Sequence, residues 1–444
     1  MIFKRKIYDA MLQWKKEMNG KSAIMIEGPR RVGKSTIVEN FAQNEYDSYL
    51  LIDFSKAPKE VFSLFDDISD LNYVFLRFKL LYGVQLFERK SAIIFDEIQE
   101  CPKARQAIKH LVKDGRYDYI ETGSLISIKK NVKNIIIPSE ETKLNLNPMD
   151  YEEFLWALGD TTTTPLLKDV FERKESLGDG VNRKLMRNFR LYMLIGGMPQ
   201  AVESYLNSND LGIVDKTKRN IIQLYEDDFK KLDQSGRIST LFDAIPSELN
   251  KNSSRYQITS VIGGSTSSTV ENQLIAELND SKTINMAYHA NDPGVGLSLN
   301  MDINKYKMFV CDTGLFVTLA FKDKEFTENI IYQKLLSDKL DANLGYVYEN
   351  VVAQMLKAKG DNLFYYTFPT GSGSHNYEID FILSRNGKIC PVEVKSSSYK
   401  RHVSMDSFGE KFSGRIDEKY LVYTKDLKKE NGVTYLPVYM TQFL

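Results

Sequence analysis

Short apolar runs alternate with amphipathic stretches over residues 22–156. The apolar runs SAIMIEG, SYLLIDF, SAIIFDEI and YDYIETGS have the length of strands, and the stretches between them carry apolar residues at helical spacing. Regular alternation of strand and helix is typical of a parallel sheet with crossover helices. The pattern therefore predicts an α/β fold with a parallel-sheet core domain at residues 1–156.

The pattern changes after this core. Residues 184–232 are helical in period and are interrupted by GGMP at 196–199, which is a helix-breaking combination. We expect a helical, lid-like region at residues 157–237.

Residues 238–305 show helices followed by two strand-like runs around NDPG at 291–294, an order typical of a winged-helix domain. Its second helix, Ser265–Leu278, contains no Lys or Arg. Phosphate contacts usually need such residues, so packing or coupling is favoured over insertion into a DNA groove.

Composition excludes several classes of protein. The chain has 444 residues, 42% of them hydrophobic and 27% charged, as in globular proteins with several domains. Lys plus Arg and Asp plus Glu both number 59, so attraction to nucleic acid must be local. Three scattered cysteines suggest neither disulfides nor structural zinc. No run approaches the ~20 apolar residues of a membrane span, so we expect a cytoplasmic protein without membrane contact.

The strongest motif follows the first apolar run. Gly28-Pro29-Arg30-Arg31-Val32-Gly33-Lys34-Ser35 fits G-x-x-x-x-G-K-[ST], with Thr36 next, and opens a predicted helix to about Gln43. Backbone N–H groups of such a loop cradle phosphates. We expect Lys34 to reach the β and γ phosphates of ATP and Ser35 to ligate Mg²⁺.

Acids end a later apolar run. Asp96 and Glu97 follow AIIF at 92–95; Asp96 is expected to hold Mg²⁺ through water, and Glu97 to act as general base in ATP hydrolysis. Thr122 ends a further run and is expected either to contact the γ-phosphate or the water, or to cap a following helix.

These motifs resemble a known family. GPRRVGKS, IIFDEIQ, ETGS, PMDYEEFLWAL and YMLIGGMPQAV occur in the same order in a group of prokaryotic AAA-type ATPases within the AAA+ superfamily. Its C-terminal domain of unknown function is similar to FVCDTGLF and YVYENVVAQML here. The resemblance implies ATP binding and hydrolysis, and homo-oligomers as an option.

The last region, residues 306–444, holds a predicted helix at Tyr346–Lys359 and an acidic hairpin. Alternating runs flank Asn386-Gly387, the strongest short hairpin signal. This register sets Asp380 opposite Glu393, and Glu378 opposite Lys395. Like charges at opposed positions destabilise a hairpin. A divalent cation or Lys395 would relieve the repulsion between Asp380 and Glu393.

The set Glu349, Asp380, Glu393 and Lys395 resembles the PD-(D/E)xK nuclease fold, although Ile379 stands where the family has proline. Glu349 shares a helical stripe with core positions. The resemblance implies that Asp380 and Glu393, with Glu349 nearby, bind Mg²⁺ or Mn²⁺, and that Lys395 assists phosphodiester cleavage.

Three functions follow from these motifs. The first is an ATPase whose cycle controls a nuclease-like module acting on DNA. The second is an ATP-dependent regulatory switch with an inert hairpin. The third is a nucleotide-dependent DNA-binding protein without cleavage activity.

Overall fold

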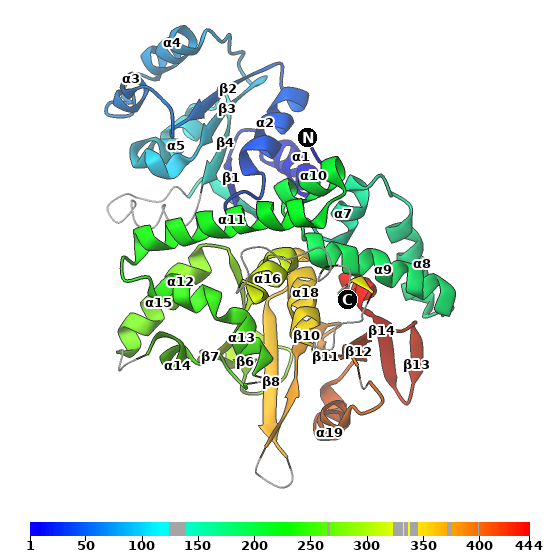
Figure 1. The fold of residues 1–444 in the computed structure, drawn as a ribbon. Helices are drawn as coiled ribbons and strands as arrows, with labels where there is room; N and C mark the ends of the chain where they lie inside the picture. The colour runs from blue at the N-terminus through cyan, green and yellow to red at the C-terminus, as the bar shows by residue number, and fades with distance from the viewer. Residues whose placement is uncertain are drawn as a thin grey trace. The chain divides into compact units, whose positions relative to one another are not determined.

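The computed structural model describes residues 1–123, 139–251, 253–263, 267–322, 332, 336–337, 345–370, 375–397 and 399–444. The chain divides into two compact units (Figure 1), residues 1–147 with 280–282 and residues 148–279 with 283–444. Within the described residues, no helix combines the length and apolar character that crossing a membrane requires.

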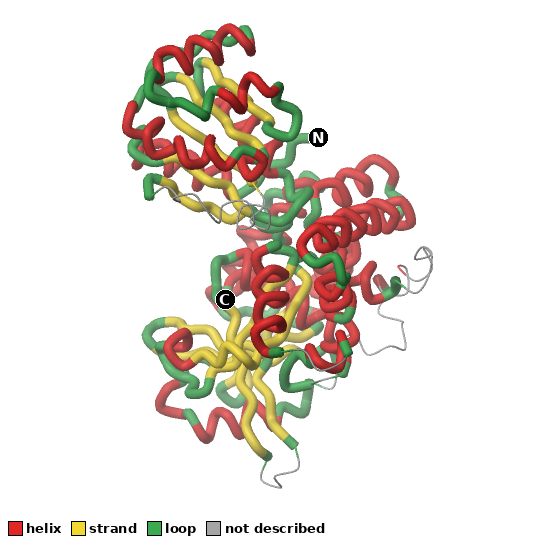
Figure 2. The backbone as a smooth tube through the Cα atoms, turned by 90° about the vertical axis from the view of Figure 1, so that its left-hand side faces the viewer, coloured by secondary structure: helices red, strands yellow, loops and turns green. Residues whose placement is uncertain are grey.

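The first unit is a parallel sheet with helices on both faces (Figure 2). Its strands lie in the order β2-β3-β4-β1-β5, and every adjacent pair is parallel. The elements are α1 (Ile7–Met18), β1 (Ala23–Glu27), α2 (Lys34–Glu45), β2 (Ser48–Asp53), α3 (Lys59–Ser63), α4 (Leu71–Tyr82), β3 (Ser91–Asp96), α5 (Pro102–Asp114), β4 (Asp118–Gly123) and β5 (Glu141–Asn145). The predicted parallel α/β core is confirmed.

Alternation along the strands explains the two cores. Met25 of β1 packs in one apolar cluster with residues of α3, α4 and α5, whereas its neighbours Ile24 and Ile26 pack in the other with residues of α1 and α2. Successive strand residues point to opposite faces. Strands covered on both faces are therefore apolar throughout, as the runs in the sequence indicate.

One buried acid in this sheet gives a prediction about stability. Glu121 of β4 is fully buried, and neither carboxylate oxygen has a hydrogen-bond partner among the described residues. Desolvation, with a contribution from Glu141, raises the pKa of Glu121 well above its ordinary value. The Glu121 carboxyl ionises at a lower pH in the unfolded chain than in the folded one. It therefore lowers the free energy of unfolding increasingly as pH rises above about 4.5.

We expect Glu121→Gln to raise the unfolding temperature, because the amide resembles the protonated carboxyl that the fold prefers. The advantage should grow by up to about 1.4 kcal/mol per pH unit above the unfolded pKa. Thermal unfolding at acidic and mildly alkaline pH measures it. Glu60→Gln, at an exposed position in α3, should show no such trend; an equal effect of both variants at every pH would contradict the assignment.

The second unit combines helices with two mixed sheets. The sheets have the strand orders β7-β6-β8-β9 and β10-β11-β12-β14-β13. Its helices are α7 (Tyr151–Ala157), α8 (Thr163–Arg173), α9 (Asp179–Ile195), α10 (Pro199–Ser208), α11 (Leu211–Leu232), α12 (Arg237–Asp243), α13 (Ile245–Asn250), α14 (Ile258–Ile262), α15 (Ser268–Asp280), α16 (Thr313–Ala320), α18 (Gly345–Ala358) and α19 (Val403–Lys411). Its strands are β6 (Ile284–Ala290), β7 (Met301–Val310), β8 (Leu363–Pro369), β9 (Asn376–Ile379), β10 (Phe381–Arg385), β11 (Lys388–Val394), β12 (Lys419–Tyr423), β13 (Lys428–Glu430) and β14 (Val433–Pro437).

Local signals place several of these helices. Asp150 and Glu153 form a reciprocal capping box at the start of α7, which fixes the helix predicted from MDYEEFLWAL. The GGMP segment separates α9 from α10, and Pro199 occupies the first turn of α10, where its missing N–H costs nothing.

The strand pairing does not stop at the expected boundary between residues 305 and 306. This boundary falls inside β7. β6 pairs antiparallel with β7 and parallel with β8, so the expected wing strands share a sheet with later residues. The winged-helix and nuclease-like domains stay predictions.

Candidate functional site

The phosphate-loop motif forms the turn between β1 and α2. Arg31 and Gly33 have positive φ values of 67° and 96°, and the second is unstrained because glycine lacks a Cβ. A Cβ on Gly28 would lie 2.3 Å from the carbonyl oxygen of Leu146. Gly28 and Gly33 thus allow a backbone path that larger residues would obstruct.

Lys34 lies inside this turn. Its Nζ donates hydrogen bonds to the carbonyl oxygens of Gly28 and Pro29, both at 3.0 Å, and the residue is only 7% exposed. Val32 is buried, while Arg30, Arg31 and Thr36 are exposed at the surface of the loop and first helical turn. The lysine head is therefore held at the centre of the expected phosphate site.

Asp96, at the end of β3, joins the loop to the rest of the sheet. Ser35 Oγ donates to Asp96 Oδ1 at 2.9 Å, and Thr122 Oγ1 donates to the same oxygen. β4 lies between β1 and β3, so Thr122, on β4, reaches Asp96 directly. The fold brings together three of the predicted site residues.

Glu97 follows Asp96 in a left-handed conformation, with φ 53° and ψ 47°. Its backbone N–H donates to Thr122 Oγ1 at 3.3 Å, and Gln99 Nε2 donates to its Oε2. Thr122 Oγ1 thus contacts both the carboxylate of Asp96 and the backbone N–H of Glu97. Its alternative role as a helix cap concerns residues 124–138, which lie outside the described part of the chain.

Arg5 is a residue of this site that the sequence analysis missed. It is 6% exposed, and its Nη1 donates to the carbonyl oxygen of Val32 at 3.2 Å. Its Nη2 donates to Asn147 O at 2.5 Å. Arg5 therefore supports the loop from behind. An arginine in a polar N-terminal segment carries no sequence signal for such a contact.

The C-terminal hairpin has the predicted register. Phe381 lies opposite Val392, and Arg385 opposite Lys388, which continues to Asp380 opposite Glu393. Asp380 itself interrupts the strand between β9 and β10, and its Oδ2 accepts a hydrogen bond from Val394 N at 2.7 Å.

Glu378 departs from the expected arrangement. It pairs with Thr367 of β8 and accepts a hydrogen bond from Lys307, instead of lying opposite Lys395. The reason is the interruption at Asp380, because β9 pairs with β8 and leaves the β10–β11 hairpin.

The Nζ atom of Lys395 lies 2.8 Å from the Oε1 atom of Glu393. Glu393 is 3% exposed, and its Oε2 has no hydrogen-bond partner among the described residues. Burial raises the pKa of Glu349, and the neighbouring Asp380 raises it further. Burial, with Glu378 as the next cause, also raises the pKa of Asp380. These carboxyls crowd one another in a poorly solvated place.

Among the described residues, no group of three or more His, Cys, Asp or Glu is arranged to hold a metal ion. Glu349, Asp380 and Glu393 therefore share an electrostatic environment without forming a ready-made ligand set.

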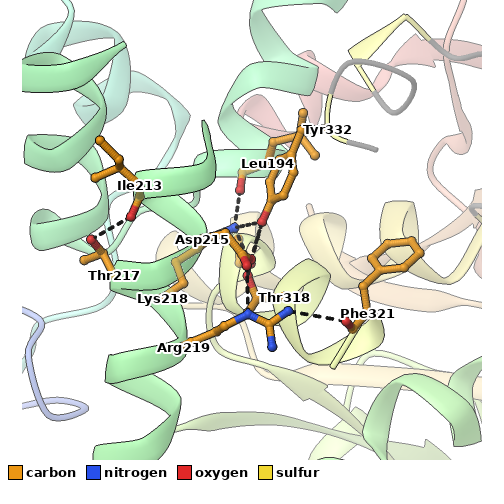
Figure 3. A network of polar contacts seen from close by, with 10 residues as sticks. Leu194, Ile213, Asp215, Thr217, Lys218, Arg219, Thr318, Phe321 and Tyr332 are labelled. Carbon is orange, nitrogen blue, oxygen red and sulfur yellow. Dashed lines mark hydrogen bonds and ion pairs between the residues drawn. The ribbon is translucent and has the colours of Figure 1, made fainter. Parts of the chain in front are cut away.

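A second buried polar cluster ties the helices of the second unit (Figure 3). Lys218 of α11 donates to Leu194 O at 2.6 Å, and to Gly314 O and Tyr332 Oη, both at 3.1 Å. Desolvation lowers the pKa of Lys218 to about 8, although Asp215 opposes the shift. This lysine lies on an amphipathic helix, where its spacing gave no reason to expect a buried role.

Two motifs that marked the family resemblance meet beside this cluster. Asp312, from FVCDTGLF, caps α16 and accepts a hydrogen bond from Gly197 N at 2.5 Å. Its carboxylate leaves no room for a Cβ on Gly196, whose φ is 82°. The GGMP and CDTG segments are therefore packing partners, which accounts for the small residues in both.

Comparisons with known proteins support the P-loop fold of the first unit. Residues 20–155 match the family model of an AAA domain. Residues 186–325 and 344–440 match two domains of unknown function, DUF8612 and DUF4143 respectively. No curated protein matches the chain.

The solved structures similar to this chain include three at low sequence identity. The Walker-type ATPase paby2304 of Pyrococcus abyssi is 17% identical, with 72% of this chain and 96% of that chain covered and a TM-score of 0.44. The RuvB Holliday junction branch migration motor of Thermotoga maritima is 11% identical, with 64% and 89% covered and a TM-score of 0.28.

The third is a signal transduction ATPase with numerous domains, PH0952 of Pyrococcus horikoshii, at 14% identity and a TM-score of 0.26. The alignment covers 79% of this chain and 45% of that one. The phosphate-loop geometry of residues 20–155 agrees with their match to the family model of an AAA domain and supports a P-loop domain of this type.

Proposed function

We propose that the protein binds and hydrolyses ATP at the first unit. The observation that carries this proposal is the hydrogen bond between Ser35 and Asp96, because it joins the phosphate loop to the acid-bearing strand. A hydroxyl and a carboxylate at this distance fit a Mg²⁺ ion that accompanies a triphosphate. When bound, this ion would neutralise charge on the phosphates.

The chain's own residues then have separable roles. Lys34 exchanges its carbonyl partners for phosphate oxygens, and the loop N–H groups orient the same phosphates. Glu97 accepts a proton from the attacking water, and Thr122 holds the position of the acids. Release of inorganic phosphate from ATP, measured with Mg²⁺ and with a chelator in excess, tests the proposal. Absence of turnover at any Mg²⁺ concentration would overturn the hydrolysis part.

We also propose that the second unit cleaves phosphodiester bonds at the acidic hairpin. The buried Oε2 of Glu393, which has no hydrogen-bond partner among the described residues, favours this function, since a buried carboxylate oxygen without a hydrogen bond is costly. Asp380 and Glu393 would hold Mg²⁺ or Mn²⁺, which supplies charge neutralisation at the phosphate. Glu349 adds a third acid close by, and Lys395 orients water.

Glu393→Gln should lower metal-dependent cleavage of a DNA oligonucleotide by at least about 10- to 100-fold, because altering even a residue that only supports a metal ligand costs that much. Cleavage is measured with Mg²⁺ and with Mn²⁺, each with and without ATP. A matched control is Glu418→Gln, since Glu418 is a partly buried acid in the same unit that accepts hydrogen bonds from Tyr420 and Thr434.

The control variant should cleave at the wild-type rate. Equal rates for wild type and Glu393→Gln would contradict the nuclease proposal. If the wild type hydrolyses ATP but cleaves no DNA, the ATP-dependent switch becomes the better description of the protein.

A further inference from the structure

A cavity of about 1360 Å³ lies in the second unit, between α9 and the segment that follows β12. One wall is formed by the loop before α9 and by α9 itself, and the other by residues 423–428. Pockets for small molecules usually have volumes of about 300–1,000 Å³. This cavity therefore has room for a segment of a polymer.

Five of the described residues in the two walls are basic. Arg183, Arg187 and Arg190 lie on one face of α9, and Lys425 and Lys428 lie on the opposite wall. Arg183 and Arg187 are exposed. Neither has an ion pair or side-chain hydrogen bond with any part of the chain that the structure describes. Their charges are available to a ligand.

The acid in the second wall is already engaged. Asp426 accepts hydrogen bonds from Ser176 Oγ at 2.5 Å, Leu177 N at 3.1 Å and Gly178 N at 2.6 Å. These bonds tie the loop before α9 to the segment after β12. Asp426 is thus engaged in holding this loop, and Asp179 is the other acid among the described residues of the lining. The described residues of the lining thus carry an excess of positive charge.

The spacing of the arginines suits a chain of phosphates. Residues 183, 187 and 190 are four and three positions apart, so a helix places them about 6 and 4.5 Å apart along its axis. Guanidinium groups in such a row can bind successive phosphates. Tyr399 also lines the cavity, with its ring centroid 5.2 Å from that of Tyr423. Aromatic rings beside a basic groove are typical of sites for single strands.

The cavity adjoins the acidic hairpin. β12 pairs in parallel with β11, with Leu421 opposite Glu393, and Lys395 N donates to Val422 O at 2.8 Å. The cavity wall begins at the next residue, Tyr423. A nucleic-acid strand bound in the cavity would therefore lie close to the acidic hairpin.

We propose that this cavity binds the backbone of single-stranded nucleic acid and directs it to Asp380 and Glu393. The inference deepens the proposed phosphodiester cleavage and rests on it for the fate of the bound strand. Arg183 and Arg187 contact phosphates, and Tyr399 offers a ring to an unstacked base.

The test is binding of a fluorescein-labelled oligothymidylate of about 20 nucleotides, a length above the site size of one basic groove. Anisotropy is measured on the full chain, without divalent cations, at several salt concentrations. Replacing both Arg183 and Arg187 with Gln should weaken binding about tenfold near 50 mM salt and reduce the slope of log K against log salt by about 1.4. Lys184→Gln, at an exposed position of the same helix outside the lining, should change neither quantity.

Each outcome decides between the two proposals. Unchanged oligothymidylate binding by the double variant, or displacement of the probe by inorganic phosphate at equal concentration, would overturn the cavity assignment. Tighter binding of a duplex that is equally sensitive to the arginines would overturn the preference for single strands. If binding depends on the arginines but cleavage does not depend on Glu393, the cavity assignment stands and the cleavage proposal fails. If cleavage depends on Glu393 but binding does not depend on the arginines, the cleavage proposal stands and the cavity assignment fails.

Discussion

Lys34→Ala is expected to weaken ATP binding by at least about 100-fold. The Nζ of Lys34 already lies inside the loop, 3.0 Å from each of two carbonyl oxygens. Phosphate oxygens would take over these positions with a full opposite charge. Hydrogen bonds to charged groups contribute about 1.5–3 kcal/mol each, and about 1.4 kcal/mol corresponds to a factor of ten. Isothermal titration of the full chain with ATP and Mg²⁺ measures the loss.

A matched control separates this effect from a general loss of positive charge. Lys21 is exposed and precedes β1, so Lys21→Ala removes the same charge from the same unit away from the loop. This variant should bind ATP within about twofold of wild type, since surface charges are screened over about 10 Å at ordinary ionic strength. Equal dissociation constants for Lys34→Ala and wild type would show that the loop does not bind the triphosphate.

The fold of the first unit could be predicted because its signals are local. Strands covered on both faces are continuously apolar, and each run is separated from the next by an amphipathic helix. The Asp380–Glu393 register was equally accessible, since the Asn386-Gly387 turn and alternation along two adjacent strands determine it. In both cases neighbouring residues carry the information.

The remaining features depend on residues far apart in the chain. Arg5 binds Val32 O, and Lys218 binds Leu194 O and Gly314 O. Each contact involves a backbone carbonyl, which has no identity in the sequence. A buried lysine or arginine can thus look like a surface charge until the fold shows its partner. The strand break at Asp380 also escaped prediction, because β8 competes with β11 for the strand that contains Glu378.

Glu97→Gln is expected to lower ATP turnover by about 1000-fold while leaving ATP affinity within a few-fold of wild type. A positioned general base contributes about 10²–10⁴ to a rate, and an amide of the same shape cannot accept the proton. Glu97 adopts a left-handed conformation that costs about 1–2 kcal/mol in residues with a Cβ. Its N–H and carboxylate are held by Thr122 and Gln99. The amide oxygen of the variant can still accept the hydrogen bond from Gln99, so the turn should persist.

The measurement pairs the steady-state rate of phosphate release with the dissociation constant for ATP. Glu100→Gln serves as the control, because Glu100 is an exposed acid on the same 3₁₀ turn, three residues away. It should hydrolyse ATP at the wild-type rate. Normal turnover by Glu97→Gln would assign the base to another residue, whereas loss of both binding and turnover would show that Glu97 shapes the phosphate site. A loss of turnover with unchanged ATP affinity would assign Glu97 to proton transfer and not to ATP binding, because Asp96 and Ser35 remain in place in the variant.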